Sequence, residues 1–185
     1  MARRLHAAGA GADALSFTGF AVGISAALLI AGHFFSWALC AILLSRLIDA
    51  LDGAVARLTT PTDRGGFLDI SLDFLFYASI PLAFAVADPS RNALPAAALL
   101  AAFIGTGSSF LAFATIAAKR GMTSTAYPDK SFFFLGGLAE AGETLACFAA
   151  MCLWPQHFAL LAWIFCGLCA LTIAMRIYWG WLAFK

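Results

Sequence analysis

Long apolar runs separated by short polar breaks fill most of this sequence. In order, the runs cover residues 16–35, 36–58, 65–87 and 93–118, and two more lie between Lys130 and the C-terminus, separated near Trp154 and Pro155. A helix of about 20 apolar residues spans the hydrocarbon core of a bilayer, which is roughly 30 Å thick. The pattern therefore predicts an all-α, polytopic membrane protein with six transmembrane helices, built as a single domain over residues 1–185.

The polar breaks contain residues that form turns or end helices. Residues 58–66, LTTPTDRGG, carry Pro, Thr, Asp and Gly and are predicted to connect the second helix to the third. The next predicted break is DPSRN at residues 88–92, and residues 119–130 form the longest connection. Ahead of the first run, residues 1–14 are basic and rich in Ala and Gly, which is compatible with a short interfacial helix.

The composition agrees with a location in the membrane. Hydrophobic residues make up 63% of the chain and charged residues 11%, which is far more apolar than an average soluble domain. The net charge of +1 forms no long block, so no nucleic-acid-binding surface is expected. All five cysteines lie in apolar runs and are expected to pack as small hydrophobes, because Cys166-x-x-Cys169 lacks the second ligand pair of a metal site.

The basic residues predict the orientation of the chain, since Lys and Arg concentrate on the cytoplasmic side of membrane proteins. With six spans, one side would hold Arg3, Arg4, Arg57, Arg64, Lys119, Arg120, Lys130 and Lys185, and the other only Arg91. We therefore expect the termini, and the connections after the second and fourth helices, to face the cytoplasm. A bacterial inner (cytoplasmic) membrane is the expected location, and a first helix without a cleavable signal is expected to be retained.

Four carboxylates interrupt the apolar pattern between residues 49 and 73. In a helix, Asp49, Asp52 and Ala56 share one face, and the spacing of Asp69 and Asp73 places them on one face of the next helix. Paired as an antiparallel hairpin, the two helices would bring all four aspartates to one pocket near the cytoplasmic boundary of the membrane.

Divalent cations are the predicted counter-charge for these aspartates. Each uncompensated acidic group deep in a transmembrane helix costs about 2.5 to 3.5 kcal/mol. Hard oxygen ligands without nearby His or Cys favour Mg²⁺, Mn²⁺ or Ca²⁺, and two such ions about 4 Å apart hold a pyrophosphate for in-line displacement. The alternative is purely structural salt bridging between helices by Arg46, Arg57 or Arg64.

The spacing of these residues resembles a family signature. D-x-x-D-G-x-x-A-R, a loop and G-x-x-x-D-x-x-x-D mark the CDP-alcohol phosphotransferases, which include the phosphatidylglycerophosphate, phosphatidylinositol-phosphate and phosphatidylserine synthases. All fixed positions of the signature are present here, as Asp49, Asp52, Gly53, Ala56, Arg57, Gly65, Asp69 and Asp73. The loop between Arg57 and Gly65 is one residue shorter than is usual in the family.

The resemblance implies a role for each of these positions. It implies that the four aspartates bind Mg²⁺ or Mn²⁺, as two ions, and that Gly53, Ala56 and Arg57 contact the CDP group. It also implies that Asp73 is the base that accepts the proton of the incoming alcohol. The residues alone support the metal ions but do not single out the base.

Other polar positions leave alternatives open. Asp13, Ser16 and Thr18 lie where the family has a polar motif near the nucleotide, but Asp13 or Ser16 would equally serve as a helix cap. Arg46 is expected to pair with Asp49, or else to bind an anionic acceptor. Lys130 and Ser131 resemble a phosphate-binding pair at the start of the fifth span, where an ordinary membrane anchor is the alternative.

Two glutamates lie within the predicted fifth span. A helix that starts near Lys130 would place Glu140 about 15 Å deep, since each residue adds about 1.5 Å. Carboxylates in the membrane are functional by default. Glu140 and Glu143 are therefore candidates to line the acceptor cavity, to pair with Arg176, or to sit protonated between helices.

The function expected from this combination is phospholipid synthesis. A phosphatidyl group would pass from CDP-diacylglycerol to a small hydroxyl acceptor, with release of CMP, in a protein that is expected to be a homodimer. A second reading within the family uses a soluble CDP-alcohol and a lipid acceptor. A cation-coupled transporter is the alternative from another class, although the sequence lacks the two similar halves typical of transporters.

Overall fold

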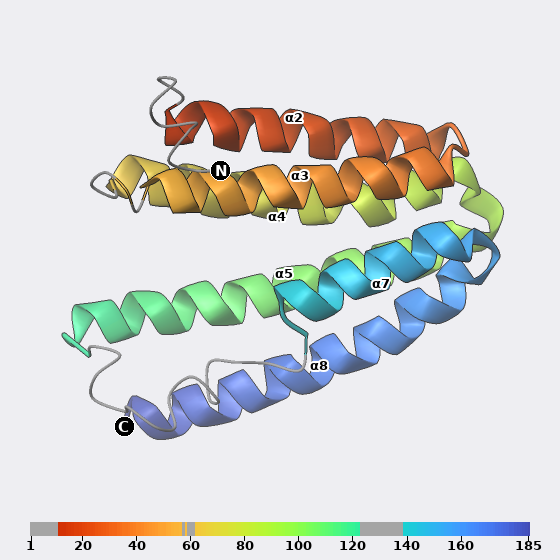
Figure 1. Cartoon of the computed structure of the whole chain (residues 1–185). Coiled ribbons are helices and arrows are strands. Elements are labelled where there is room, and N and C mark those ends of the chain that lie inside the picture. The colour runs from red at the N-terminus through yellow and green to blue at the C-terminus, as the bar shows by residue number, and fades with distance from the viewer. Residues whose placement is uncertain (1–10, 57, 59–61, 123–138) are drawn as a thin grey trace. The chain divides into compact units, whose positions relative to one another are not determined.

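The computed structural model describes residues 11–56, 58, 62–122 and 139–185, and every regular element in these ranges is a helix (Figure 1). The chain divides into two compact units, Met1–Ala93 and Leu94–Lys185. The predicted interfacial helix at residues 1–14 lies largely outside the described residues. The all-α prediction is confirmed for the described part of the chain.

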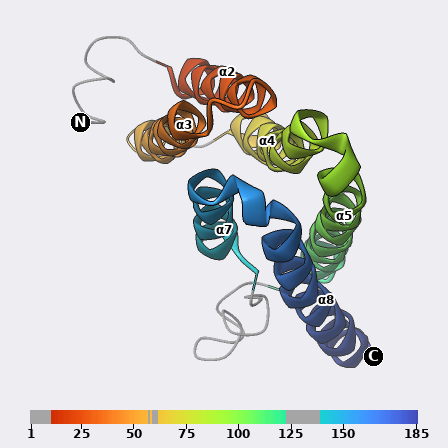
Figure 2. The ribbon, with the colours of Figure 1, turned by 90° about the vertical axis from the view of Figure 1, so that its right-hand side faces the viewer.

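The first unit contains three long helices that run side by side. They are α2 (Ala12–Ala31), α3 (Phe35–Ala56) and α4 (Asp63–Ala87), and α2 packs against both of the others (Figures 1 and 2). The breaks between them, at residues 32–34 and 57–62, fall within four residues of the predicted positions. Gly11 is the N-cap of α2, so the interpretation of Asp13 or Ser16 as the cap of this helix is wrong.

Two glycines allow α2 to approach its neighbours closely. A Cβ atom at Gly19 would lie 3.3 Å from Ile48, and one at Gly23 would lie 2.6 Å from the Phe76 ring. Ser45 Oγ also donates a hydrogen bond of 2.7 Å to the Gly19 carbonyl. Such small-xxx-small spacing is a common way for membrane helices to bring their backbones together. The middle of α2 is thereby held against both α3 and α4.

The interior of the first unit is apolar. Ile30, Ile42, Phe76 and Ile80 are fully buried there. Buried aromatic and branched side chains of this kind are the usual source of packing energy, at about 1.5 to 3 kcal/mol for each large side chain removed from water. Between helices in a bilayer, the favourable energy comes from tight van der Waals packing and not from removal of side chains from water, because lipid is as apolar as the side chains.

The predicted break at residues 88–92 is confirmed, but it is only one residue long. The helix α5 (Pro89–Lys119) begins directly after Asp88, which is the only residue between it and α4. Proline is favoured in the first turn of a helix, and Asp88 Oδ1 accepts hydrogen bonds from Ser90 Oγ and the Arg91 backbone amide. The bond from Ser90 lowers the pKa of the exposed Asp88 carboxyl. A polar segment that looks like a loop is therefore a capped helix start.

The second unit contains most of α5 together with α7 (Ala141–Leu153), the short 3₁₀ helix η2 (Pro155–His157) and α8 (Phe158–Ala183). Phe103 of α5 packs edge-on against Phe148 and Phe165. Arg176 Nη1 donates a hydrogen bond of 2.9 Å to the Thr106 carbonyl. The predicted break near Trp154 and Pro155 is confirmed.

Glu140 and Glu143 lie at the start of α7. Glu140 is the N-cap of α7 with an extended backbone, so the predicted continuous helix from Lys130 through Glu140 is wrong. The two side chains form a capping box, in which each accepts a hydrogen bond from the backbone of the other residue. The depth of 15 Å inferred from a continuous helix therefore does not apply, and Lys130 and Ser131 lie outside the described residues.

Four stretches of the described residues are long and apolar enough to cross a membrane: α2, α4, α5 and Pro155–Ala183. The other two α-helices, α3 and α7, are not among these stretches. Helix α3 carries Arg46, Asp49 and Asp52 along an otherwise apolar sequence, and α7 is only 13 residues long. Six α-helices are present in the described residues, but six membrane crossings stay a prediction.

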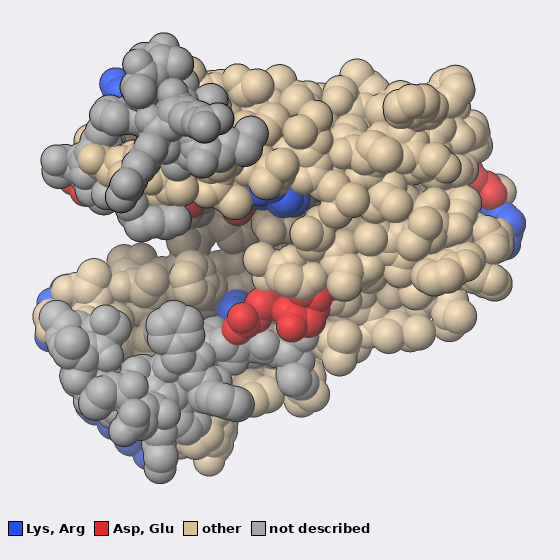
Figure 3. Space-filling view, in the orientation of Figure 1, with Lys and Arg blue, Asp and Glu red and all other residues tan. Residues whose placement is uncertain are grey.

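The outward-facing side chains fit a bilayer. Leu28, Trp37 and Trp181 are each at least 70% exposed. Charged groups are few on the described part of the face shown in Figure 3. Of the cysteines expected to pack inside, Cys152 and Cys169 are buried but Cys40 is exposed on α3, so the packing prediction fails for Cys40. An apolar side chain need not be buried by protein when lipid surrounds it.

Candidate metal centre

Helices α3 and α4 bring three carboxylates together. One oxygen atom from each of Asp49, Asp69 and Asp73 lies within 4.8 Å of the other two. Asp49 and Asp73 are half-buried, whereas Asp69 is exposed. Three negative charges at this separation repel one another strongly unless a cation lies between them. Among the described residues, no other group of three or more His, Cys, Asp or Glu side chains brings its ligand atoms this close together.

Asp52 lies beside this group rather than in it. Its side chain is buried, with 5% of the residue exposed, and Oδ2 accepts a hydrogen bond of 2.6 Å from Ser16 Oγ. Asp52 still lies close enough to Asp69 and Asp73 for electrostatic repulsion. The prediction that all four aspartates converge is therefore confirmed for three of them, and the fourth is held from α2.

A cation from the protein itself reaches the carboxylates. Arg46 Nη1 lies 2.5 Å from Asp73 Oδ1 and 3.5 Å from Asp49 Oδ2. The predicted pairing of Arg46 with Asp49 is confirmed, and the pairing with Asp73 was not foreseen. The Arg46 side chain is 13% exposed and the Asp73 side chain 31%, so the pair is partly shielded from water and is stronger than a fully exposed surface pair.

The position of Arg46 is fixed by further contacts. Its guanidinium carbon lies 4.2 Å from the centre of the Phe76 ring, and Nη2 donates a hydrogen bond of 3.3 Å to Ser45 Oγ. Ser45 is in turn bonded to Gly19 of α2. Among the described residues, one buried side-chain polar atom has no hydrogen-bond partner. This atom is Nε of Arg46. Charge and the aromatic ring, rather than complete hydrogen bonding, therefore determine where this side chain lies.

The start of α4 is fixed by a cap and an ion pair. Thr62 is the N-cap, and its Oγ1 accepts a hydrogen bond of 3.1 Å from the Gly65 amide. Arg64 forms an ion pair with Asp13 at the start of α2. The structural alternative, in which Arg64 forms a salt bridge with one of the four aspartates, is therefore wrong for this residue, because its partner is Asp13. These contacts set the register from which Asp69 follows one turn later.

The donor set fits a hard divalent cation. All three grouped ligands are carboxylates, which suit Mg²⁺, Mn²⁺ and Ca²⁺, whereas zinc favours sites with His or Cys. Partial exposure leaves room for water or phosphate oxygens to complete the coordination, which Mg²⁺ in particular retains.

Gly53 and Ala56, the predicted nucleotide-binding positions on α3, lie beyond Asp49 toward the end of the helix. Both are partly exposed, and Asp49, Asp52 and Ala56 belong to one continuous helix as predicted. Arg57 lies outside the described residues. Glu140 and Glu143 form the capping box of α7 in the second unit.

Three contributors to this centre were not found from the sequence. Phe76 and Ser45 support Arg46, and the Gly19-x-x-x-Gly23 spacing lets α2 come close enough for Ser16 to reach Asp52. The glycine spacing was a usable signal, since small residues four apart are typical of close helix packing in membranes. No signal in the sequence marks Phe76 among the other apolar residues of α4.

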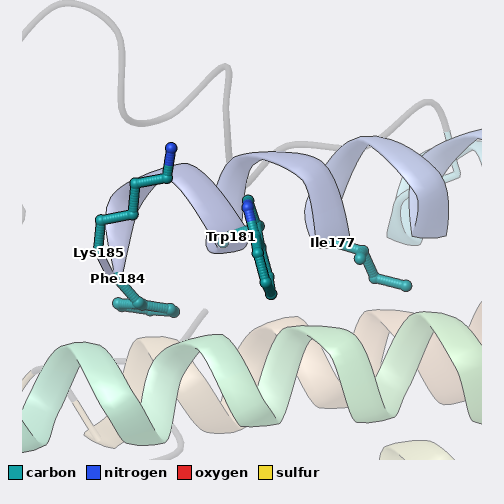
Figure 4. Close-up of a pocket in the computed structure, with 5 residues that line it drawn as sticks. Ile177, Trp181, Phe184 and Lys185 are labelled. Atoms are coloured by element: carbon teal, nitrogen blue, oxygen red, sulfur yellow. The ribbon is translucent and has the colours of Figure 1, made fainter.

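A separate hollow lies at the C-terminal end of α8 (Figure 4). It has a volume of about 400 Å³ and is lined by Ile177, Gly180, Trp181, Phe184 and Lys185. Figure 4 shows the Lys185 side chain extending away from the apolar residues. No Asp, Glu, His or Cys is among these lining residues, so their side chains offer no metal ligand.

Comparison with known proteins is consistent with this geometry. The pattern that defines the CDP-alcohol phosphatidyltransferase family matches residues 11–175. The inner membrane protein YnjF of Escherichia coli (strain K12) is 51% identical over 173 residues, which cover 94% of this chain and 84% of that protein. The crystal structure of Mycobacterium tuberculosis phosphatidylinositol phosphate synthase with CDP-DAG bound has a similar fold, with a TM-score of 0.69 and 21% identity over 97% of this chain and 91% of that one.

Proposed function

Because the chain belongs to the CDP-alcohol phosphatidyltransferase family, we propose that it moves a phosphatidyl group from CDP-diacylglycerol to a small hydroxyl acceptor and releases CMP. The family and the apolar helices make it a membrane transferase of phospholipid synthesis. The donor, the acceptor and the metal dependence are the proposal. The observation that carries it is the convergence of Asp49, Asp69 and Asp73 beside the buried Asp52.

The proposed cofactor is Mg²⁺ or Mn²⁺, as two ions held by Asp49, Asp52, Asp69 and Asp73. Such ions neutralise the pyrophosphate of the donor and the charge that develops as the phosphoryl group is transferred. The carboxylate group supports this proposal because its oxygens are close together and hard. The hydrogen bond from Ser16 would orient the Asp52 carboxylate as a metal ligand.

Asp73 is the proposed base. The acceptor oxygen would form a bond to the β-phosphorus of the donor while the bond from that phosphorus to the bridging oxygen breaks, so that CMP leaves with this oxygen. The hydroxyl proton would pass to Asp73. The hydrogen bond from Arg46 Nη1 to Asp73 Oδ1 would fix the orientation of this carboxylate.

The nucleotide is proposed to lie along the end of α3. Gly53 and Ala56 have little or no side chain, which gives a flat helix surface for the CDP group, and Arg57 would meet its phosphates. Ser16 is proposed as a further contact of the bound nucleotide from α2. The hydrogen bond between Ser16 and Asp52 supports this placement, because it brings α2 to the edge of the centre.

CDP-diacylglycerol is the favoured donor for two reasons. The structural relative from M. tuberculosis holds CDP-DAG, and the carboxylates of this chain lie on helices whose outer surfaces are apolar. A soluble CDP-alcohol with a lipid acceptor is the second candidate, since the same metal chemistry serves both. The proposed acceptor is a small alcohol.

The setting of the enzyme is also part of the proposal. We propose an inner (cytoplasmic) membrane location, as its relative YnjF is named an inner membrane protein, with the centre facing the cytoplasm. The basic residues Arg64, Lys119 and Arg120 support that orientation. We further propose that residues 1–185 act as one catalytic domain and that the protein is a homodimer.

The test is release of CMP by the purified protein. Protein in lipid-detergent micelles is given CDP-diacylglycerol, Mn²⁺ or Mg²⁺, and in turn serine, glycerol 3-phosphate, inositol phosphate and phosphatidylglycerol, and lipid products are identified by mass spectrometry. We expect CMP and one new lipid with one acceptor, and none with Asp73→Asn. Asp88→Asn is the matched control, because it makes the same chemical change at the far end of α4 in a residue that caps equally well as Asn.

Two results would overturn the proposal. Absence of CMP with every donor and acceptor, while the folded protein takes up a solute in a way that depends on Asp49 and Asp69, would favour a transporter. Release of CMP from a soluble CDP-alcohol, but not from CDP-diacylglycerol, would replace the donor and keep the family chemistry.

A further inference from the structure

We propose that Arg46 is a built-in cation of the metal centre, which neutralises Asp49 and Asp73 in the absence of divalent ions and weakens the binding of these ions. The inference rests on the proposed metal dependence and goes beyond it, because it assigns a role to a residue outside the family signature. Arg46 would act as a positioning residue and would not touch the substrate.

The contacts of Arg46 place one positive charge at the carboxylates. Nη1 lies 2.5 Å from Asp73 and 3.5 Å from Asp49, so a single nitrogen serves both side chains. A divalent ion would have to interact with these same two carboxylates. The guanidinium and the metal ion therefore compensate the same negative charge, and each reduces the need for the other.

Further contacts also hold the Arg46 side chain in one position. Its guanidinium lies on the ring of Phe76, which is fully buried, and Nη2 contacts Ser45, which is bonded to the backbone of Gly19. Three helices thus hold one side chain in place. A residue that recognised a substrate anion would need its donors free, whereas the Nη1 atom of Arg46 is already engaged by Asp73.

The consequence is a reciprocal coupling between Arg46 and the metal ion. Without ions, loss of the arginine charge leaves the three close carboxylates to repel one another, so the helices of the first unit separate more easily. With ions bound, the repulsion is relieved by the metal. Thermodynamic linkage then requires that a protein without this charge binds the ion more tightly, by about tenfold for a typical coupling between two sites.

The experiment measures Mn²⁺ binding to the full-length protein in detergent by titration calorimetry, together with thermal unfolding at several Mn²⁺ concentrations. Arg46→Gln removes the charge, and Arg46→Lys keeps it. Arg91→Gln is the matched control, because it makes the same charge change beyond the far end of α4, which lies about 27 Å from Asp69 along that helix. Arg46→Gln is purified in Mn²⁺, so that a variant that is unstable without ions can still be measured.

We expect Arg46→Gln to bind Mn²⁺ about tenfold more tightly than the unchanged protein, and to unfold at a lower temperature only when Mn²⁺ is removed. Arg46→Lys and Arg91→Gln should bind Mn²⁺ about as the unchanged protein does. Equal or weaker binding by Arg46→Gln would overturn the inference, and so would failure of this variant to fold even in Mn²⁺.

The same titrations separate this inference from the proposed function. If the unchanged protein binds no Mn²⁺ or Mg²⁺, the metal-dependent function fails and the inference falls with it. If the unchanged protein binds Mn²⁺ and Asp69→Asn abolishes binding, but Arg46→Gln gives no gain, only the role assigned to Arg46 is wrong.

Discussion

Ser16 Oγ donates a hydrogen bond of 2.6 Å to Asp52 Oδ2, which joins the first turns of α2 to the carboxylates of α3 and α4. Asp52 is buried, and a buried carboxylate without a hydrogen-bond donor is costly. The bond therefore stabilises the carboxylate and fixes its orientation. It also makes α2 part of the centre, although α2 contributes none of the grouped aspartates.

The first prediction concerns this hydrogen bond. Ser16→Ala removes the donor and leaves Asp52 free to turn, so we expect kcat/KM to fall about tenfold, the usual scale for one bond to a charged group. Ser25→Ala is the matched control, because the exposed Ser25 hydroxyl donates its hydrogen bond to the Val22 carbonyl of its own helix. Equal activity of the two variants would show that Ser16 does not orient Asp52.

The second prediction concerns the grouped carboxylates. Asp49→Asn and Asp69→Asn each remove one charge and one strong ligand, so we expect the affinity for Mn²⁺ to fall by more than about tenfold, since even outer-shell partners contribute that much. Calorimetric titration of the protein in detergent checks this. Asp88→Asn should bind Mn²⁺ as tightly as the unchanged protein, and a comparable loss in all three variants would indicate a general charge effect.

The arrangement of the helices was largely predictable because apolar runs and turn residues carry the signal locally. The breaks near His33 and in the segment of residues 58–66 needed only Gly, Pro and polar neighbours to be recognised. The length of the break at Asp88 was misjudged because Pro, Ser and Asn suit a helix start as well as a loop. The start of α7 was missed because a capping box in an apolar context looks like a pair of buried acids.

Helical periodicity predicts which residues of the candidate centre share a face of one helix, but not how the helices meet. Spacing alone placed Asp69 and Asp73 on one face, and the structure confirms that they meet Asp49. The separation of Asp52 from this group depends on how closely α2 approaches, which is a tertiary property. The pairing of Arg46 with Asp73 depends in the same way on how α3 lies beside α4, and a sequence pattern does not give that geometry.

The third prediction separates a structural role of Glu143 from a catalytic one. Because Glu143 Oε2 accepts a hydrogen bond from the Glu140 amide, Glu143→Ala should lower the free energy of unfolding by about 1 kcal/mol, and Glu143→Gln should not, since Gln serves equally well in a capping box. Thermal unfolding in detergent measures this. Activity per folded molecule should be the same in both variants, and loss of activity in Glu143→Gln would instead indicate a role of the carboxylate charge.

The fourth prediction tests whether the close approach of α2 supports the centre. A Cβ atom at Gly23 would lie 2.6 Å from Phe76 and 3.0 Å from Ser45 Oγ. Phe76 is fully buried, so it can move only by disturbing its neighbours, and overpacking of this kind costs about 1 to 3 kcal/mol. We therefore expect Gly23→Ala to lower the temperature of unfolding.

The same substitution should reach the metal centre, because Phe76 and Ser45 are the residues that hold Arg46 in place. A displaced Arg46 compensates Asp73 less well, so Gly23→Ala should bind Mn²⁺ more tightly than the unchanged protein, in the direction expected for Arg46→Gln but to a smaller extent. Gly167→Ala is the matched control, since a Cβ atom there meets nothing within 4 Å and alanine favours the helix by up to about 1 kcal/mol. If Gly23→Ala and Gly167→Ala give the same unfolding temperature and the same Mn²⁺ affinity, the glycine contact contributes neither to packing nor to the position of Arg46.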